Sequence, residues 1–188
     1  MVGLPGSGKT VRARELAATH RALRFTPDEW MIALYDGVQP DGKRDLLEGR
    51  LITVALQALR LNTNVVLDFG LWSRDERSAL RWLAEAAGTS CRVVYLPVDA
   101  DVQQARVAER QAATPHLTFP MTVSDLVAWR DLFEAPDADE LSGAAITDPP
   151  PGWPGWREWA VDRWPTLEPP PIGEQPGSTF QDPGATQG

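Results

Sequence analysis

The chain has 188 residues and a formal net charge of −8, with one cysteine, Cys91, and two histidines. A single cysteine excludes an internal disulfide framework and is typical of a reducing cytoplasm, and these three residues are too few for a structural zinc site. No apolar run is long enough to span a membrane, whereas the length suffices for one domain with a core and a tail.

The negative charge is concentrated in the C-terminal part of the chain. Residues 1–135 hold 16 Lys and Arg against 17 Asp and Glu, a balance of −1, whereas residues 136–188 hold 2 against 9, a balance of −7. Because the longer part is nearly neutral, its charge neither favours nor excludes binding of a phosphate-rich molecule such as a nucleic acid.

A phosphate-binding motif stands at the start of the chain. The run Gly3-Leu4-Pro5-Gly6-Ser7-Gly8-Lys9-Thr10 matches the pattern G-x-x-x-x-G-K-[ST] completely. Glycines let backbone N–H groups approach a phosphate chain, and the following helix adds the positive end of its dipole. We expect Lys9 to reach the β- and γ-phosphates and the Thr10 hydroxyl to ligate Mg²⁺. The residues expected to bind the nucleotide are Gly3, Gly6, Ser7, Gly8, Lys9 and Thr10.

The segment before this motif is shorter than such a loop requires. A phosphate loop normally follows a buried strand, and here only Met1 and Val2 precede Gly3. A sheet without that strand would leave backbone groups unpaired. We therefore expect the natural start to lie upstream, with a short apolar run before Met1. After the motif, apolar spacing predicts a helix from Thr10 to His20.

Two predicted strands each deliver an acid. Leu23–Phe25 is a short alternating run, closed by the turn and helix-start residues that include Asp28. Asn64–Phe69 is a continuous apolar run that contains Asp68 near its end. Because ligands bind at the carboxyl edge of open parallel sheets, both acids are candidates for a site there.

The remaining elements alternate between helix and strand up to Glu134. We expect a loop over Tyr35–Lys43 and a further buried strand over Cys91–Val98. The expected helices span residues 45–61, 74–87, 99–111 and 123–133, the second of them opened by the capping-box sequence Ser73-Arg74-Asp75-Glu76.

Beyond Glu134 the composition changes, since 11 of the 17 prolines lie there. We predict an edge strand over Ser142–Thr147 and a Trp-rich helix over Trp156–Arg163 whose aromatic face packs on the domain. The resulting division is a domain that begins with the phosphate-binding motif over 1–135, a Trp/Pro-rich extension over 136–164, and a disordered, Pro-rich tail over 165–188.

Strands alternating with helices after a phosphate loop predict an α/β fold, a doubly wound, mostly parallel sheet. Residues 3–135 resemble the small P-loop kinases that include polynucleotide 5′-hydroxyl kinases, zeta-toxin-type kinases and chloramphenicol phosphotransferase. The resemblance rests on the loop Gly3–Thr10, the acid Asp28, the strand ending at Asp68, Arg74 and Arg77 after it, and Arg106 with Arg110 on a later helix. It implies a three-layer kinase-like domain that binds ATP and Mg²⁺.

The resemblance also implies roles for the two acids. Asp28 matches the carboxylate that orients and deprotonates the acceptor hydroxyl; the alternative is a helix N-cap. Asp68 corresponds to a group that holds the Mg²⁺ shell or the acceptor, and the alternative is a strand-end acid facing water.

Four arginines have similar pairs of interpretations. Arg106 and Arg110 match the lid arginines that close over the triphosphate, or else they are helix-surface residues that pair with Glu109. Arg74 and Arg77 are expected to include one acceptor contact, and a solvated helix face explains either one about as well.

The acceptor itself is less well defined by the sequence. Members of the resembled family often carry an arginine three residues after the acid, whereas Met31 stands there in this chain. Trp30 and Trp72 are expected to line the acceptor pocket and suggest an acceptor with an apolar face. Without a basic stripe, a small molecule is the first choice and a nucleic-acid 5′ end the second. A third hypothesis is an ATP-binding regulatory or toxin-related module that changes shape with little turnover.

Overall fold

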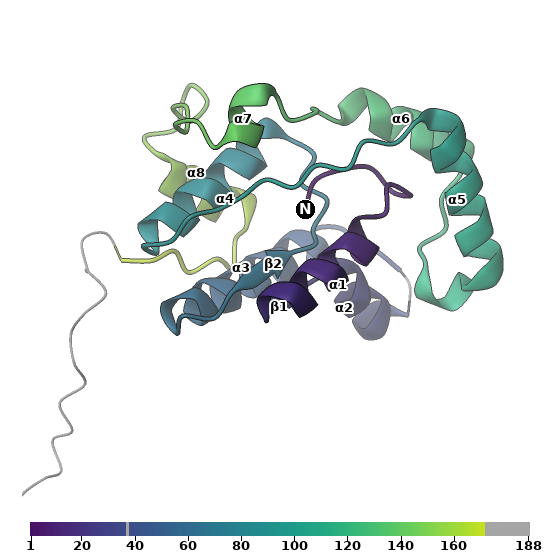
Figure 1. The fold of residues 1–188 in the computed structure, drawn as a ribbon, viewed down its shortest axis with the longest axis horizontal. Coiled ribbons are helices and arrows are strands. Elements are labelled where there is room, and N and C mark those ends of the chain that lie inside the picture. Colours follow the sequence, from purple (N-terminus) through teal and green to yellow (C-terminus); the bar gives the residue numbers. More distant parts are fainter. Residues whose placement is uncertain (37, 172–188) are drawn as a thin grey trace, which may run out of the picture.

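The computed structural model describes residues 1–36 and 38–171 (Figure 1). Two short parallel strands, β1 (Leu23–Phe25) and β2 (Val65–Leu67), pair in the register Leu23↔Val65 through Phe25↔Leu67. Both lie where the sequence predicts strands. Their parallel pairing across a helical connection is that of an α/β fold.

Two further extended segments continue the sheet beyond β2. Val2 forms parallel bridges to Gly70 on one side and Tyr95 on the other, and its amide donates to the Val94 carbonyl at 2.9 Å. The order of segments is therefore β1, β2, Val2, Tyr95. The strand predicted over Cys91–Val98 is wrong in extent, because Tyr95 is the only residue of this segment that forms a bridge. Its partner is the single residue Val2.

Helices make up most of the rest of the described chain. They are α1 (Lys9–His20), α2 (Pro27–Tyr35), α3 (Lys43–Arg60), α4 (Arg74–Ala86), α5 (Ala100–Ala113), η1 (Pro115–Leu117), α6 (Val123–Leu132), α7 (Ala138–Ser142) and α8 (Trp156–Arg163). The expected capping box is present at α4, where the Glu76 amide donates to Ser73 Oγ at 3.1 Å. Apolar periodicity therefore identified the long helices correctly, with ends that differ by one or two residues.

The sheet separates α1 from α3. Both helices pack against β1 and β2. The connection from Val2 to β1 crosses the sheet in one direction, and the connection from β1 to β2 returns in the other. Since parallel crossovers are right-handed, α1 and α3 lie on opposite faces, which gives a doubly wound arrangement.

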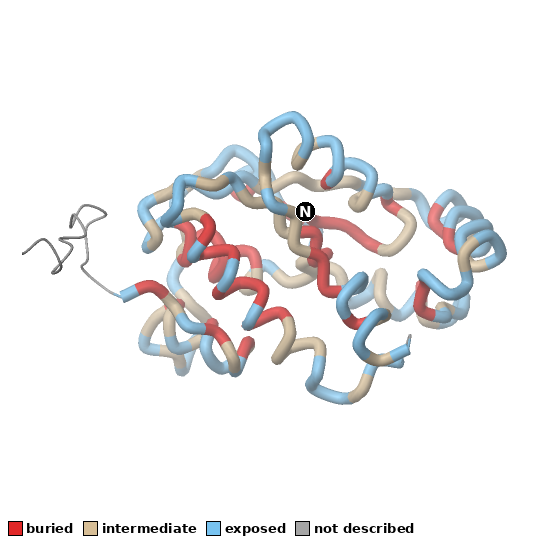
Figure 2. The backbone as a smooth tube through the Cα atoms, turned by 90° about the horizontal axis from the view of Figure 1, so that it is seen from below, coloured by how far each residue is buried: buried red, intermediate tan, exposed pale blue. Residues whose placement is uncertain are grey.

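The main hydrophobic core lies on the α3 face and includes the C-terminal extension. It joins Leu51 and Ile52 of α3, Leu83 of α4, Trp156 of α8, and Trp164 directly after α8. In Figure 2, buried residues appear as red stretches along several segments of the backbone. The side chain of Trp164, the C-cap residue of α8, is fully buried. The prediction that the aromatic face of this helix packs on the domain is thus confirmed.

Two predictions about the extension are wrong. The edge strand predicted over Ser142–Thr147 is not formed, because α7 ends at Ser142 and the segment after it pairs with side chains instead of a strand. For example, Trp156 Nε1 donates to the Thr147 carbonyl at 2.8 Å. The tail does not become structureless at Pro165. Leu167 is in the core, and the Glu168 amide donates to Thr53 Oγ1 at 2.9 Å. The part of the predicted disordered tail beyond residue 171 lies outside the described residues.

Gly49 in α3 explains how the segment around Thr166 and Leu167 can pack so close to this helix. A Cβ atom on Gly49 would lie 2.5 Å from Thr166 Oγ1 and 2.9 Å from the Leu167 amide nitrogen. Only glycine lets the backbone at Leu167 lie directly against the helix.

None of the helices within residues 1–36 and 38–171 has both the length and the apolar character needed to cross a membrane.

Candidate nucleotide and acceptor site

The phosphate-binding motif forms a loop whose amides are available to an anion. Gly6 and Gly8 have φ angles of 78° and 91°, in the left-handed region that favours glycine, and Gly8 caps α1. In the described part of the chain, the backbone N–H groups of Gly6, Gly8, Lys9 and Thr10 donate to no other group. The first turn of α1 contains no acid. This loop is therefore an anion site at a helix N-terminus.

Close packing around the loop fixes its shape. A Cβ atom on Gly6 would lie 3.1 Å from the Gln103 carbonyl oxygen of α5, and one on Gly3 would lie 2.7 Å from the Leu96 carbonyl oxygen. Ser7 is buried, and its Oγ has no hydrogen-bond partner in the described chain. A phosphate oxygen bound at the loop would give this buried hydroxyl, and the free amides beside it, a hydrogen-bond partner.

Lys9 extends from the start of α1 and is held against the loop. Its Nζ donates to the Leu4 carbonyl at 2.8 Å. Burial lowers the pKa of Lys9 to about 8, although the carboxylates of Asp68 and Asp28 act in the opposite direction. The ammonium is thus poorly solvated, and a nearby anion would stabilise its charged form.

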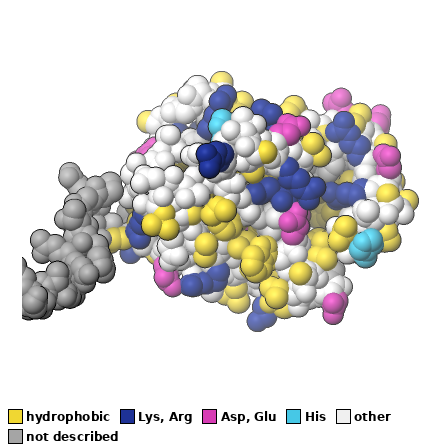
Figure 3. All heavy atoms as spheres, turned by 60° about the horizontal axis from the view of Figure 1, so that its bottom comes forward, with side chains coloured by type: hydrophobic (Ala, Val, Ile, Leu, Met, Phe, Trp, Pro, Cys, Tyr) yellow, Lys and Arg dark blue, Asp and Glu magenta, His cyan; other side chains and the backbone are white. Residues whose placement is uncertain are grey.

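One cavity of about 1170 Å³ brings most of the predicted site residues together. Its walls include Lys9, Thr10, Asp28, Asp68, Trp72, Arg106 and Arg110. Figure 3 shows basic side chains gathered in a band across one face of the molecule, with hydrophobic side chains beside it. Loop, acids and lid arginines therefore face the same space.

Both predicted acids are held by arginines that the sequence did not single out. Arg24 Nε lies 3.2 Å from Asp68 Oδ2, and Arg44 Nη1 lies 2.8 Å from Asp28 Oδ1. Asp68 is buried, whereas the Asp28 side chain is 58% exposed. Oδ2 of Asp28 accepts no hydrogen bond from the described residues, so it can accept one from a ligand.

The predicted lid arginines lie on α5, one turn apart. Arg106 Nη1 donates to the Gly6 carbonyl at 3.2 Å, and Arg110 also faces the cavity. Neither pairs with Glu109 or with any other carboxylate among the residues described here. Their charges remain available to an anion in the cavity.

Three predicted acceptor contacts lie away from the cavity wall. Arg77 is buried and donates through Nε and Nη2 to Glu140 at 2.7 and 2.9 Å. Arg74 pairs with Asp137 at 2.9 Å, and Trp30 is 51% exposed on α2. The arginines join α4 to the C-terminal extension, so neither of their side chains is positioned to contact an acceptor in this cavity.

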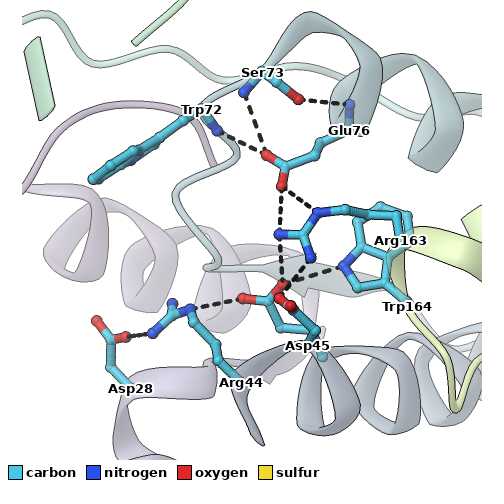
Figure 4. A network of polar contacts seen from close by, with 9 residues as sticks. Asp28, Arg44, Asp45, Trp72, Ser73, Glu76, Arg163 and Trp164 are labelled. Atoms are coloured by element: carbon cyan, nitrogen blue, oxygen red, sulfur yellow. Dashed lines mark hydrogen bonds and ion pairs between the residues drawn. The ribbon is translucent and has the colours of Figure 1, made fainter. Parts of the chain in front are cut away.

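A polar network that contributes to the lining of the cavity connects four helices (Figure 4). Arg163 of α8 pairs with Asp45 at 2.5 Å and with Glu76 at 2.8 Å. Arg44 pairs with Glu48 at 2.9 Å, and Trp164 Nε1 also donates to Glu48 at 3.2 Å. Burial raises the pKa of Glu48, against the effect of Arg44. The network links the extension to Asp28 through Arg44.

The sequence contained a signal for only part of this network. Arg44 and Glu48 are four residues apart on one helix, a spacing that places them side by side. Arg163 lies 118 residues from Asp45, and no local pattern predicts that contact.

These residues fit a magnesium nucleotide. The free amides and Ser7 Oγ suit phosphate oxygens, and Lys9 suits their charge. The Thr10 hydroxyl and Asp68 face the same cavity and are oxygen ligands of the kind Mg²⁺ prefers. Within the described residues no cluster of three or more His, Cys, Asp or Glu can hold a metal alone.

Comparison with known proteins agrees with this geometry. Residues 1–136 match a family model described as an AAA domain. A search of curated proteins found no significant match. The matched segment contains the loop, both acids and α5, and it ends before the segment that supplies Arg163.

Proposed function

The chain belongs to the AAA-domain family, whose members are kinase-like P-loop NTPases, and we propose that it transfers the γ-phosphoryl group of Mg·ATP to a hydroxyl of a small molecule. One observation carries this proposal. The anion site of the loop and the available oxygen of Asp28 face the same cavity, so a triphosphate and an alcohol would meet there.

Each side chain then has a defined task. Lys9 and the loop amides bind the β- and γ-phosphates, and Thr10 with Asp68 would hold Mg²⁺, which would offset the negative charge of the phosphates. Asp28 accepts the hydrogen bond of the acceptor hydroxyl and orients its oxygen toward the γ-phosphorus. A bond forms between these two atoms, and the bond from the γ-phosphorus to the bridging oxygen of ADP breaks. The hydroxyl proton passes to Asp28.

The lid arginines supply positive charge during the transfer. Arg106 and Arg110 reach the cavity from α5, whereas Asp28 and Arg44 reach it from α2 and α3. Charge spreads over the oxygens of the transferring group, and guanidinium groups stabilise it there. Arg106 can exchange the Gly6 carbonyl for a phosphate oxygen without losing a charged partner.

Asp28→Asn tests the proposal. Asparagine keeps the shape and the contact to Arg44 but cannot accept the proton, so acceptor-dependent ADP release should fall at least about 100-fold. Binding of Mg·ATP, measured by calorimetry, should stay within about threefold of the wild type. Asp36→Asn, an exposed aspartate just after α2, is the matched control and should leave both quantities unchanged.

The alternatives give different results in the same assays. Phosphate transfer to an oligonucleotide 5′ end, in place of small alcohols, would favour the nucleic-acid kinase. Tight nucleotide binding without transfer to water or to any alcohol would favour the regulatory module. Absence of Mg·ATP binding would overturn the proposal.

A further inference from the structure

The acceptor side of the cavity is built from six charged residues, here called the acceptor cluster (Figure 4). The cluster consists of Asp28, Arg44, Asp45, Glu48, Glu76 and Arg163. All of them except Asp45 face the cavity. They come from α2, α3, α4 and α8, so four separate elements converge on this wall.

The acceptor cluster contains more carboxylates than cations. Three carboxylates and two guanidinium groups of the cluster face the cavity, a formal charge of −1 there. Asp45, which does not line the cavity, brings the whole cluster to −2. Each guanidinium already has two close carboxylate partners. Arg44 lies 2.8 and 2.9 Å from its partners, and Arg163 lies 2.5 and 2.8 Å from its own. A phosphate arriving here would find both cations neutralised and excess carboxylates beside them.

The loop side of the same cavity has the opposite character. Lys9, Arg106 and Arg110 have no carboxylate within 4.0 Å in the part of the chain that the structure covers. An anion therefore gains far more on the loop side than at the acceptor cluster. Within one cavity, the loop therefore offers cations without close carboxylate partners, whereas the cations of the acceptor cluster are already paired.

Apolar side chains also line the cavity. The rings of Trp72 and Trp129 meet with centroids 5.6 Å apart, and both line the cavity. Leu71 and Phe69 are further apolar residues of its lining. A ring-shaped alcohol can pack its carbon face here while its polar groups reach the acceptor cluster.

We infer that the acceptor is a hydroxylated amine, such as an amino sugar or an aminocyclitol, and that it carries no phosphate or carboxylate group. This inference rests on the proposed function. The ammonium group is held by the excess carboxylates of the acceptor cluster, while Asp28 Oδ2 receives the reacting hydroxyl. Arg163 contributes by binding Glu76 and Asp45, which sets how much negative charge the wall presents.

Two matched sets of compounds test the inference. One set is glucosamine, glucose and glucose 6-phosphate, and the other is streptamine, inositol and an inositol monophosphate. With saturating Mg·ATP, the amine of at least one set should stimulate ADP release with a kcat/KM at least about tenfold above that of its phosphorylated counterpart. If neither amine exceeds its phosphorylated counterpart, the inference is overturned. Calorimetry with Mg·ATP alone separates that result from failure of the proposed function.

A change of charge in the acceptor cluster should change the preference of the enzyme for the amine over its phosphorylated counterpart. Glu76→Gln keeps an oxygen for the capping box but removes one negative charge, so the ratio of amine to phosphate kcat/KM should fall about tenfold. Asp45→Asn makes the same change from α3 and should act in the same direction. Asp162→Asn, an exposed residue of α8, changes the net charge equally but outside this wall and should leave the ratio unchanged. Equal shifts in all three variants would overturn the inference.

Discussion

Lys9 is a residue whose charge in the site depends directly on pH. Its lowered pKa of about 8 means that the unliganded protein loses this charge as the pH rises through that value. A bound triphosphate favours the charged form, so binding above pH 8 must be accompanied by proton uptake. Affinity should therefore fall up to about tenfold per pH unit above pH 8.

Calorimetry at pH 9 in buffers of different ionisation enthalpy measures that uptake. The wild type should take up close to one proton per nucleotide. Lys9→Arg is the control, because arginine stays charged throughout this range and should take up none. Equal uptake by both proteins would assign the proton to another group.

At the level of elements, α4 is anchored to the extension by an ion pair that cannot be hydrated. The side chains of Arg77 and Glu140 are 1% and 4% exposed. Arg77→Met leaves Glu140 buried without its partner and should lower the free energy of unfolding by about 3–5 kcal/mol. Arg74→Met removes an exposed pair with Asp137 from the same helix and should cost about 0–1 kcal/mol.

Urea unfolding of the two variants provides the comparison. Arg77→Met should also retain the wild-type preference among acceptors at temperatures where it is folded, because Arg77 lies outside the cavity. A change of preference without loss of stability would return Arg77 to the acceptor site.

How well an element could be predicted depended on where its partners lie. The α4 helix follows from local periodicity and a capping box, both of which reside in the sequence of the helix itself. The strand predicted over Cys91–Val98 depends on a neighbour from elsewhere in the chain, and Val2 supplies just one bridge. The segment 142–147 is apolar enough for a strand, but side chains of α4 and α8 satisfy its carbonyls instead.

The site residues likewise divide into those that a local motif predicts and those that only the tertiary fold brings together. Gly3–Thr10 lies in one contiguous motif, so its loop geometry was predictable. Arg24 and Arg163 reach the cavity from elements far along the chain from the acids they hold. Such contacts are set by the tertiary fold, and no spacing rule identifies them.

At the scale of the whole molecule, the extension belongs to the same cooperative unit as the kinase-like part. Trp156, Trp164 and Leu167 fill the core over α3 and α4. Removal of one large buried aromatic side chain typically costs about 3–5 kcal/mol, against a total stability of about 5–15 kcal/mol. A chain that ends at Pro136 should therefore lack cooperative unfolding.

Near-ultraviolet circular dichroism and thermal melts would check this expectation. A chain that ends at Pro171 keeps every contact described above and is the matched control. A cooperative melt of the shorter chain at the same temperature as the control would contradict the expectation.

The position of Arg163 also bears on how such proteins diversify. The phosphate-binding loop and both acids are encoded within residues 1–136, whereas Arg163, which lines the same cavity, is encoded after them. Under the proposed function, substitutions in the last part of the gene can alter this one member of the acceptor cluster and leave the loop intact. The C-terminal segment is then a place where related chains can diverge in their choice of acceptor.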